Sequence, residues 1–98
     1  MAVIKQHVVR GGIASLVLHL SDRDNGFGVI ADTLPTVDVY DPLGTTIVSG
    51  AEAELLGSGE YVYNHPTTST SRIGNYRAVF HYVVEEEEFR DDCVFMVI

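Results

Sequence analysis

The sequence predicts an all-β protein, a small antiparallel β-sandwich of seven or eight strands. Short runs that alternate apolar and polar residues recur along the 98-residue chain, and turn-forming residues separate them, most clearly from Thr36 to Tyr82. Apolar residues make up 46% of the chain, which suffices for a two-layer core and argues against disorder. This length predicts a single domain, residues 1–98.

The first strands are separated by glycines. A short strand is expected near Val3 to Val9, so that residues 1–10 form an N-terminal arm or an edge strand. Gly11-Gly12 then breaks the chain before a strand from Ile13 to Ser21, whose alternation places Leu16, Leu18 and Leu20 on one face and Val17 and His19 on the other. In the following loop, Asn25-Gly26 favours the positive φ angles of a type I′ turn.

The middle of the chain contains the clearest turn. Asp41-Pro42-Leu43-Gly44 predicts a β-turn, because proline presets φ at its second position and Asp41 can accept hydrogen bonds from the backbone that follows. The strands expected around it are Thr36–Tyr40, Thr45–Ser49 and Glu60–Asn64, while Ala51–Leu56 is either a strand or a short helical turn.

The longest strand is expected from Asn75 to about Glu85, after a hydroxyl-rich loop, Pro66–Arg72. Its alternation places one stripe of side chains in the core: Tyr76, Ala78, Phe80, Tyr82 and Val84. The last strand begins at Phe89 or Arg90 and ends at Ile98. Between the two, Glu85–Glu88 predicts an open, solvated loop, because four like charges weaken a tight hairpin. The alternative for this tetrad is contact with a basic partner surface.

The net charge disfavours two classes of partner. Fourteen acidic residues against six basic ones give a net charge of −8, which repels both nucleic-acid phosphates and anionic membranes. The sequence has no long apolar signal segment at its start and no run long enough to span a bilayer. We therefore expect protein partners, no nucleic acid and no membrane.

No catalytic, cofactor or metal motif is complete. Asp22, Asp24, Asn25 and Gly26 resemble a calcium loop, but glycine falls at position 5 and Thr33 at position 12, where such loops need glycine at 6 and glutamate at 12. The single cysteine, Cys93, lies in an apolar run and is expected to be a small buried residue. Two histidines, His19 and His81, would come together only if their strands pair. We expect no enzyme activity, no cofactor and no metal site.

Four strings carry a resemblance to a known class: Leu20-Ser-Asp-Arg-Asp-Asn-Gly26, Val37-Asp-Val-Tyr-Asp-Pro-Leu-Gly44, Gly59-Glu-Tyr-Val-Tyr63 and Gly74-Asn-Tyr-Arg-Ala-Val-Phe80. Together with the closing strand Val94–Ile98, they resemble immunoglobulin-like sandwiches of tailed-bacteriophage structural proteins and bacterial surface proteins. The resemblance covers about residues 13–98. The paired cysteines and core tryptophan of antibody domains are absent, so only the sandwich is implied.

The resemblance implies a non-enzymatic structural or interaction subunit, most simply a virion component (head decoration, neck or tail) assembled in the host cytoplasm. Such subunits bind other protein subunits as homo-oligomers or larger assemblies, and Ala2–Val9 is a candidate strand for pairing at a sheet edge. One alternative is an adhesion or accessory domain at the cell surface, from which a signal was removed; another is a small metal-binding sandwich.

Loops carry binding function on such scaffolds, so the candidate contact residues lie in loops. They are Asp22, Asp24, Asn25, Phe27, Thr67, Thr68, Arg72, Glu85, Glu86, Glu87 and Glu88.

Overall fold

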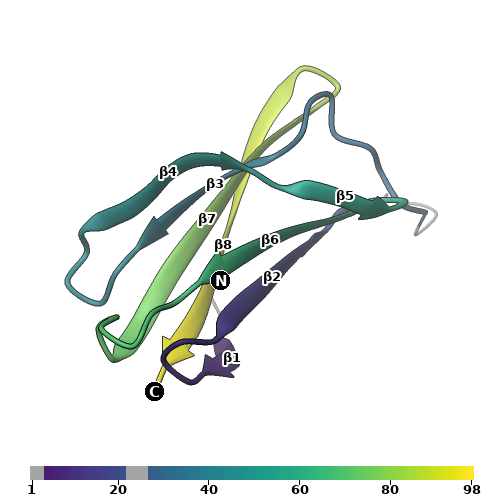
Figure 1. Ribbon diagram of the computed structural model, residues 1–98. Coiled ribbons are helices and arrows are strands. Elements are labelled where there is room, and N and C mark those ends of the chain that lie inside the picture. Colours follow the sequence, from purple (N-terminus) through teal and green to yellow (C-terminus); the bar gives the residue numbers. More distant parts are fainter. Residues whose placement is uncertain (1–3, 22–26) are drawn as a thin grey trace.

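The computed structural model describes residues 4–21 and 27–98, which form eight β-strands and no helix. The strands are arranged in two layers with the core between them (Figure 1), so the predicted all-β sandwich is confirmed. Their bounds are β1 (Ile4–Val8), β2 (Ile13–His19), β3 (Thr36–Tyr40), β4 (Thr46–Glu52), β5 (Glu54–Gly57), β6 (Glu60–Pro66), β7 (Gly74–Val84) and β8 (Glu87–Val97). No helix of the described residues is long and apolar enough to cross a membrane.

The two sheets differ in size. The larger has the strand order β1-β8-β7-β3-β4, and the smaller has the order β2-β6-β5. All pairs are antiparallel, as predicted for the sandwich, except β1 with β8, which is parallel. Local patterns do not reveal such a pair, because a parallel pair needs a long connection and here nearly the whole chain lies between the two strands.

The core lies where the predicted stripes face each other. The alternating leucines of β2 are buried, as are Val37 and Val39 of β3 and the first half of the β7 stripe. At its centre, the ring of Phe95 stacks on that of Tyr76, with centroids 5.1 Å apart, and lies 5.7 Å from His65. The predicted faces of these strands are confirmed.

The predicted turn at Asp41–Gly44 is also confirmed. Gly44 N–H donates to the Asp41 carbonyl (2.9 Å), and Asp41 Oδ1 accepts from Leu43 N–H (3.0 Å) and Thr45 N–H (2.9 Å). Gly44 has a φ of 85°, which glycine adopts without steric cost.

Ala51–Leu56 forms strand structure rather than a helical turn. The break between β4 and β5 falls at Ala53, which is buried and donates its N–H to the Pro35 carbonyl (2.9 Å). At this residue the chain passes from the larger sheet to the smaller one, which Figure 1 shows as β4 running on into β5.

His65 of β6 makes the stability of the fold depend on pH. Its ring is buried beside Tyr63, Tyr76 and Phe95, its Nδ1 has no hydrogen-bond partner among the described residues, and burial lowers its pKa below the usual 6.5. As the pH falls, His65 therefore binds a proton in the unfolded chain at a higher pH than it does in the folded chain. Stability is fully present above about pH 6.5 and falls as the pH drops below it.

Urea unfolding between about pH 7.5 and pH 5.5 measures this dependence, because most carboxylates titrate below that range. We expect the midpoint of the native protein and of His19→Gln, a change at an exposed histidine, to fall with pH. His65→Phe should give a flatter profile. Parallel profiles for all three proteins would contradict a role of His65.

Candidate functional site

The β7–β8 connection is a two-residue turn and not the open loop that the sequence predicted. Val84 pairs directly with Glu87, which leaves only Glu85 and Glu86 in the turn, and Glu87 and Glu88 belong to β8. Both turn residues have positive φ, 50° and 68°, the combination of a type I′ turn. Such turns normally use asparagine and glycine, because a side chain at positive φ is strained.

Asp32 holds this strained turn in place. Its Oδ1 accepts from Glu85 N–H (3.1 Å) and its Oδ2 from Glu86 N–H (3.0 Å). The carboxylate thus satisfies two backbone donors, although it adds a fifth negative charge. No local motif identified Asp32, since it lies 53 residues before Glu85.

Asp32 is itself positioned by two backbone hydrogen bonds. Its N–H donates to the Val83 carbonyl (2.7 Å), and the N–H of the preceding residue, Ala31, donates to Tyr61 Oη (2.9 Å) in the core. The connection between β2 and β3 is therefore fastened to both sheets at this point. These two hydrogen bonds set the position of Asp32 and therefore of the turn.

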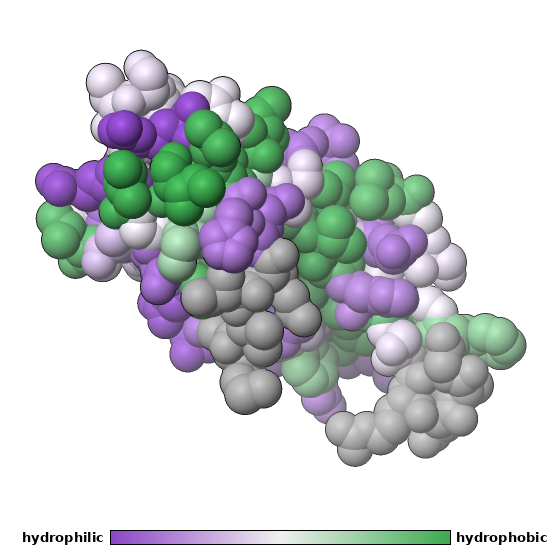
Figure 2. All heavy atoms as spheres, turned by 90° about the horizontal axis from the view of Figure 1, so that it is seen from below, coloured by the Kyte–Doolittle hydropathy of each residue, from purple (hydrophilic) through white to green (hydrophobic). Residues whose placement is uncertain are grey.

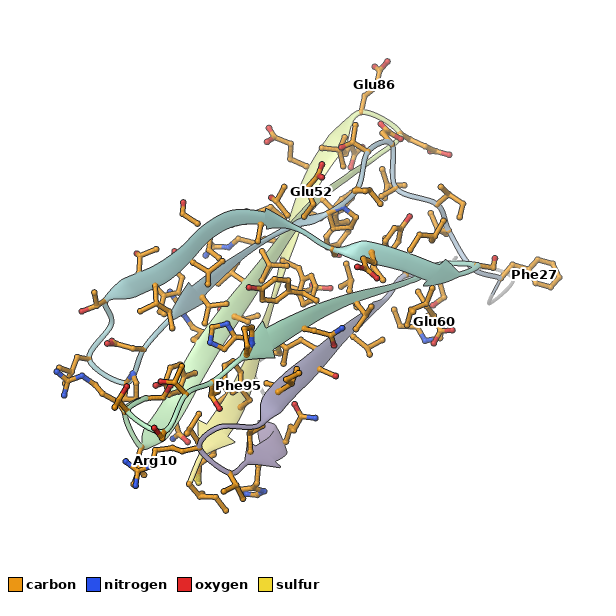
Figure 3. The ribbon with its side chains drawn as sticks, in the orientation of Figure 1. Arg10, Phe27, Glu52, Glu60, Glu86 and Phe95 are labelled. Atoms are coloured by element: carbon orange, nitrogen blue, oxygen red, sulfur yellow. The ribbon has the colours of Figure 1, made fainter. Side chains whose placement is uncertain are left out.

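We call Asp32 and Glu85–Glu88 together the acidic tip. All five residues are exposed, and Figure 3 shows the Glu86 side chain pointing away from the body of the protein. Within the described residues, no ion pair joins any of these carboxylates to a basic side chain. The acidic tip therefore holds five negative charges close together at one end of the sandwich.

An aromatic pair lies below the acidic tip. Tyr82 and Phe89 stack with centroids 5.6 Å apart, and Tyr82 Oη donates to Asp91 Oδ2 (3.1 Å). Burial, the charge of Asp91 and this hydrogen bond together raise the pKa of Tyr82 to about 12, so the phenol stays protonated and keeps donating. Tyr82 is half-buried, and Phe89 is exposed.

Two open grooves meet at this aromatic pair. The larger, of about 530 Å³, is lined by Thr33, Leu34, Thr36, His81, Tyr82, Val83, Glu88, Phe89 and Arg90. The smaller, of about 300 Å³, is lined by His19, Leu20, Ser21, Val29, Tyr82, Val84, Phe89 and Asp91. Neither sequence pattern nor motif predicted these grooves, since each combines residues of the β7–β8 hairpin with residues that lie far from it in the chain.

The predicted contact residues do not form one site. Asp22, Asp24 and Asn25, with the predicted Asn25-Gly26 turn, lie outside the described residues. Phe27 is exposed (Figure 3), and the four glutamates lie at the acidic tip. Thr68 and Arg72 lie at the other end of β7, in the loop that precedes it.

The prediction of Thr67 as a contact residue was wrong. The residue is buried rather than available for contacts: its hydroxyl donates to the Gly12 carbonyl (2.7 Å) and accepts from Gly11 N–H (3.0 Å). It fastens the β1–β2 turn. Arg72 is exposed and lies 3.8 Å from Asp41, a weak surface ion pair.

His19, His81 and Cys93 belong to three different strands, β2, β7 and β8. No group of three or more His, Cys, Asp or Glu residues in the described part of the chain is placed to hold a metal ion. His19 and His81 belong to different sheets, and His81 Nε2 lies 3.0 Å from Asp38 Oδ2. Cys93 packs partly buried against the core, where burial and the charge of Asp92 raise its pKa to about 11, so the thiol is protonated at neutral pH.

Comparison with known proteins gives no family. No protein-family model matches the chain, and no curated protein matches it significantly.

Relieving the strained turn should stabilise the protein. Glu85→Asn with Glu86→Gly suits the two positive φ values and removes two repelling charges, so we expect the free energy of unfolding to rise by about 1–2 kcal/mol. Urea denaturation measures it. Asp32→Ala, which leaves both turn amides without their acceptor, should instead lower it by about 1–3 kcal/mol. A lower free energy of unfolding for the Asn-Gly variant would show that Glu85 and Glu86 are not strained at their positive φ angles.

Proposed function

We propose that this chain is a non-enzymatic structural subunit of the immunoglobulin-like class that binds other protein subunits, with the acidic tip as a contact for a basic partner surface. Its turn and strand motifs resemble those of virion components, so we propose a role such as that of a head-decoration, neck or tail protein.

The strand order supports the immunoglobulin-like resemblance. When β2 to β8 are given the letters B, C, C′, D, E, F and G in chain order, the sheets read B-E-D and G-F-C-C′, which is the grouping of those domains. The first strand departs from the constant-type arrangement, because β1 pairs with β8 rather than β2.

The start of β7 supports it too. Tyr76 Oη donates to the carbonyl of Arg72 (2.8 Å), four residues upstream, and this contact resembles the tyrosine corner at the start of strand F in immunoglobulin-like domains. In antibody domains the second cysteine follows two residues after this tyrosine. Here Ala78, which is fully buried, occupies that place.

The observation that carries the proposed contact is the strained Glu85–Glu86 turn. Residues in unfavourable backbone conformations cluster at functional sites, where other contacts hold them in place, and here the Asp32 carboxylate does so at the cost of more like charge. A tight hairpin built for stability alone would use asparagine and glycine. A basic partner surface would neutralise this charge without moving the rigid hairpin.

A matched pair of charge variants tests the contact. The tip variant, Glu85→Gln with Glu86→Gln, and the control, Glu52→Gln with Glu54→Gln at the exposed positions on either side of Ala53, have the same net charge. With a deca-arginine peptide at about 0.15 M salt, we expect fluorescence anisotropy to show weaker binding for the tip variant only. Equal loss in both would show that net charge, and not the tip, binds cations.

The class of assembly has a separate test. A virion component should be encoded within a cluster of phage morphogenesis genes and should copurify with assembled particles. An adhesion domain at the cell surface, the alternative, should instead belong to a longer precursor with a secretion signal. A gene among metabolic genes would remove the virion proposal.

A further inference from the structure

The free edge of β2 is an unused row of backbone hydrogen-bonding groups. Thr67 N–H donates to the Gly12 carbonyl (2.9 Å) and Leu20 N–H to the Gly59 carbonyl (2.7 Å), so the even-numbered residues between them are bonded to β6. The N–H and C=O groups of Ile13, Ser15, Val17 and His19 therefore point away from β6. Within the described residues, no strand pairs with that side of β2.

β2 differs from the three other sheet edges. The pairing of β1, of β4 and of β5 each contains a shift in register, and β5 has only four residues. β2 has seven residues and pairs with β6 without any shift. It contains no proline and no acidic or basic residue apart from His19. Natural proteins protect edges with short strands, bulges, proline or charge, and this edge has none of these devices.

The outward-facing side chains of this edge are apolar at symmetric positions. Ile13 is 61% exposed and Val17 56% exposed, and Ser15 lies halfway between them. Figure 2 looks from below Figure 1, at the side on which β1 and β2 lie, and shows patches of exposed apolar side chains between polar ones. In an acidic protein this segment, from Gly11 to Leu20, contains no carboxylate.

We infer that two copies of this chain pair antiparallel through their β2 edges, about a twofold axis at Ser15. In this register Ser15 lies opposite Ser15 of the partner copy, and Ile13 lies opposite Val17 of the partner copy on both sides of the axis. Because the same odd-numbered residues present their backbone groups, the edge is complementary to itself. The two small sheets join into one sheet of six strands. Such β-branched cross-strand pairs stabilise a sheet.

Charge favours the antiparallel direction. Arg10 precedes β2, and Glu60 lies beside its far end, paired with His19; Figure 3 shows the two toward opposite ends of the strand. Both are exposed, and within the described residues neither side chain has a hydrogen bond or an ion pair. Antiparallel pairing brings Arg10 of each copy toward Glu60 of the other. A parallel arrangement would place like charges together.

This pairing names a partner and a surface for the subunit binding proposed above and rests on that function. Disulfide trapping tests its register in a Cys93→Ala background. Residues directly opposite in a hydrogen-bonded antiparallel pair have Cα atoms about 5.5 Å apart, within the range of about 4.4–6.8 Å that a disulfide spans. We expect Ser15→Cys to form a covalent dimer under mild oxidation. His19→Cys, which would face Gly11, and Ser49→Cys on β4 should stay monomeric.

Sedimentation velocity at micromolar concentration tests the association without a cross-link. Val17→Lys should weaken the dimer at least about tenfold, because it places two charges in the pair, whereas Leu56→Lys, at a 59% exposed position on the β5 edge, should not. Arg10→Glu should also weaken it, and adding Glu60→Arg should restore it. A native monomer, open-ended aggregates, equal effects of both lysine variants or no rescue would each overturn the inference.

The test of the dimer can be distinguished from the test of the acidic tip. Val17→Lys should bind deca-arginine as the native chain does, because Val17 belongs to the smaller sheet and the tip hairpin, β7–β8, to the larger one. If the dimer fails while the tip still binds, only the pairing is lost.

Discussion

Phe95→Ala should lower the free energy of unfolding by about 3–5 kcal/mol, the usual loss for removing a buried aromatic ring. Phe95 is fully buried, with no exposed surface, and its ring contacts those of Tyr76 and His65 from the other strands. Removing it opens a cavity between the two sheets. Since domains of this size are marginally stable, such a loss can take most of the stability.

The control is the same substitution at the other stacked phenylalanine. Phe89 stacks on Tyr82 much as Phe95 stacks on Tyr76, but it is 44% exposed. Phe89→Ala should therefore cost only about 1 kcal/mol, because solvent already reaches the ring. Urea unfolding of both variants measures the difference. Similar losses would mean that the core is not centred on Phe95.

Gly59→Ala should lower the free energy of unfolding by about 2–4 kcal/mol, from two causes that add. Gly59 has a φ of 77°, at which a side chain is strained. A Cβ at this position would also collide with the Leu20 carbonyl oxygen and would lie 2.8 Å from Gly28 Cα. Those atoms are backbone, so the collision is relieved only if the β5–β6 turn moves away from Leu20 and Gly28.

Gly44→Ala separates the two causes. Gly44 has a similar φ of 85°, but a Cβ there would meet nothing within 4 Å. We expect about 1 kcal/mol from backbone strain alone. Thermal or urea unfolding of both variants then gives the cost of the collision as the difference. Equal losses would show that the close approach at Gly59 yields easily.

The strands were predictable because each one carries its own signal. Alternation identified the buried faces of β2, β3 and β7, and the Asp-Pro-Leu-Gly turn was predicted with the Asp41 side chain as its acceptor. The parallel β1–β8 pair was not predictable in this way. It depends on how the sheets close, which no local pattern records.

Only part of the candidate site could be predicted from the sequence. The glutamate tetrad was identified as a charged reversal, but repulsion alone predicted an open loop. The turn closes because Asp32, fixed by bonds to Val83 and through Ala31 to Tyr61, supplies acceptors for both turn amides. For Thr67 the prediction was wrong in another way. Its place in a polar loop suggested an exposed contact residue, but its hydroxyl is buried and hydrogen-bonded to the β1–β2 turn.

The sequence by itself determined the class of fold, the turns and the sides of the strands that face the core, because period-two alternation and turn chemistry act between neighbours in the chain. Only the tertiary structure decided which strands became edges, how Asp32 closed the acidic tip and where β2 kept a free row of hydrogen-bonding groups. Those features depend on groups that are far apart in the chain, and packing of the two sheets brings them together.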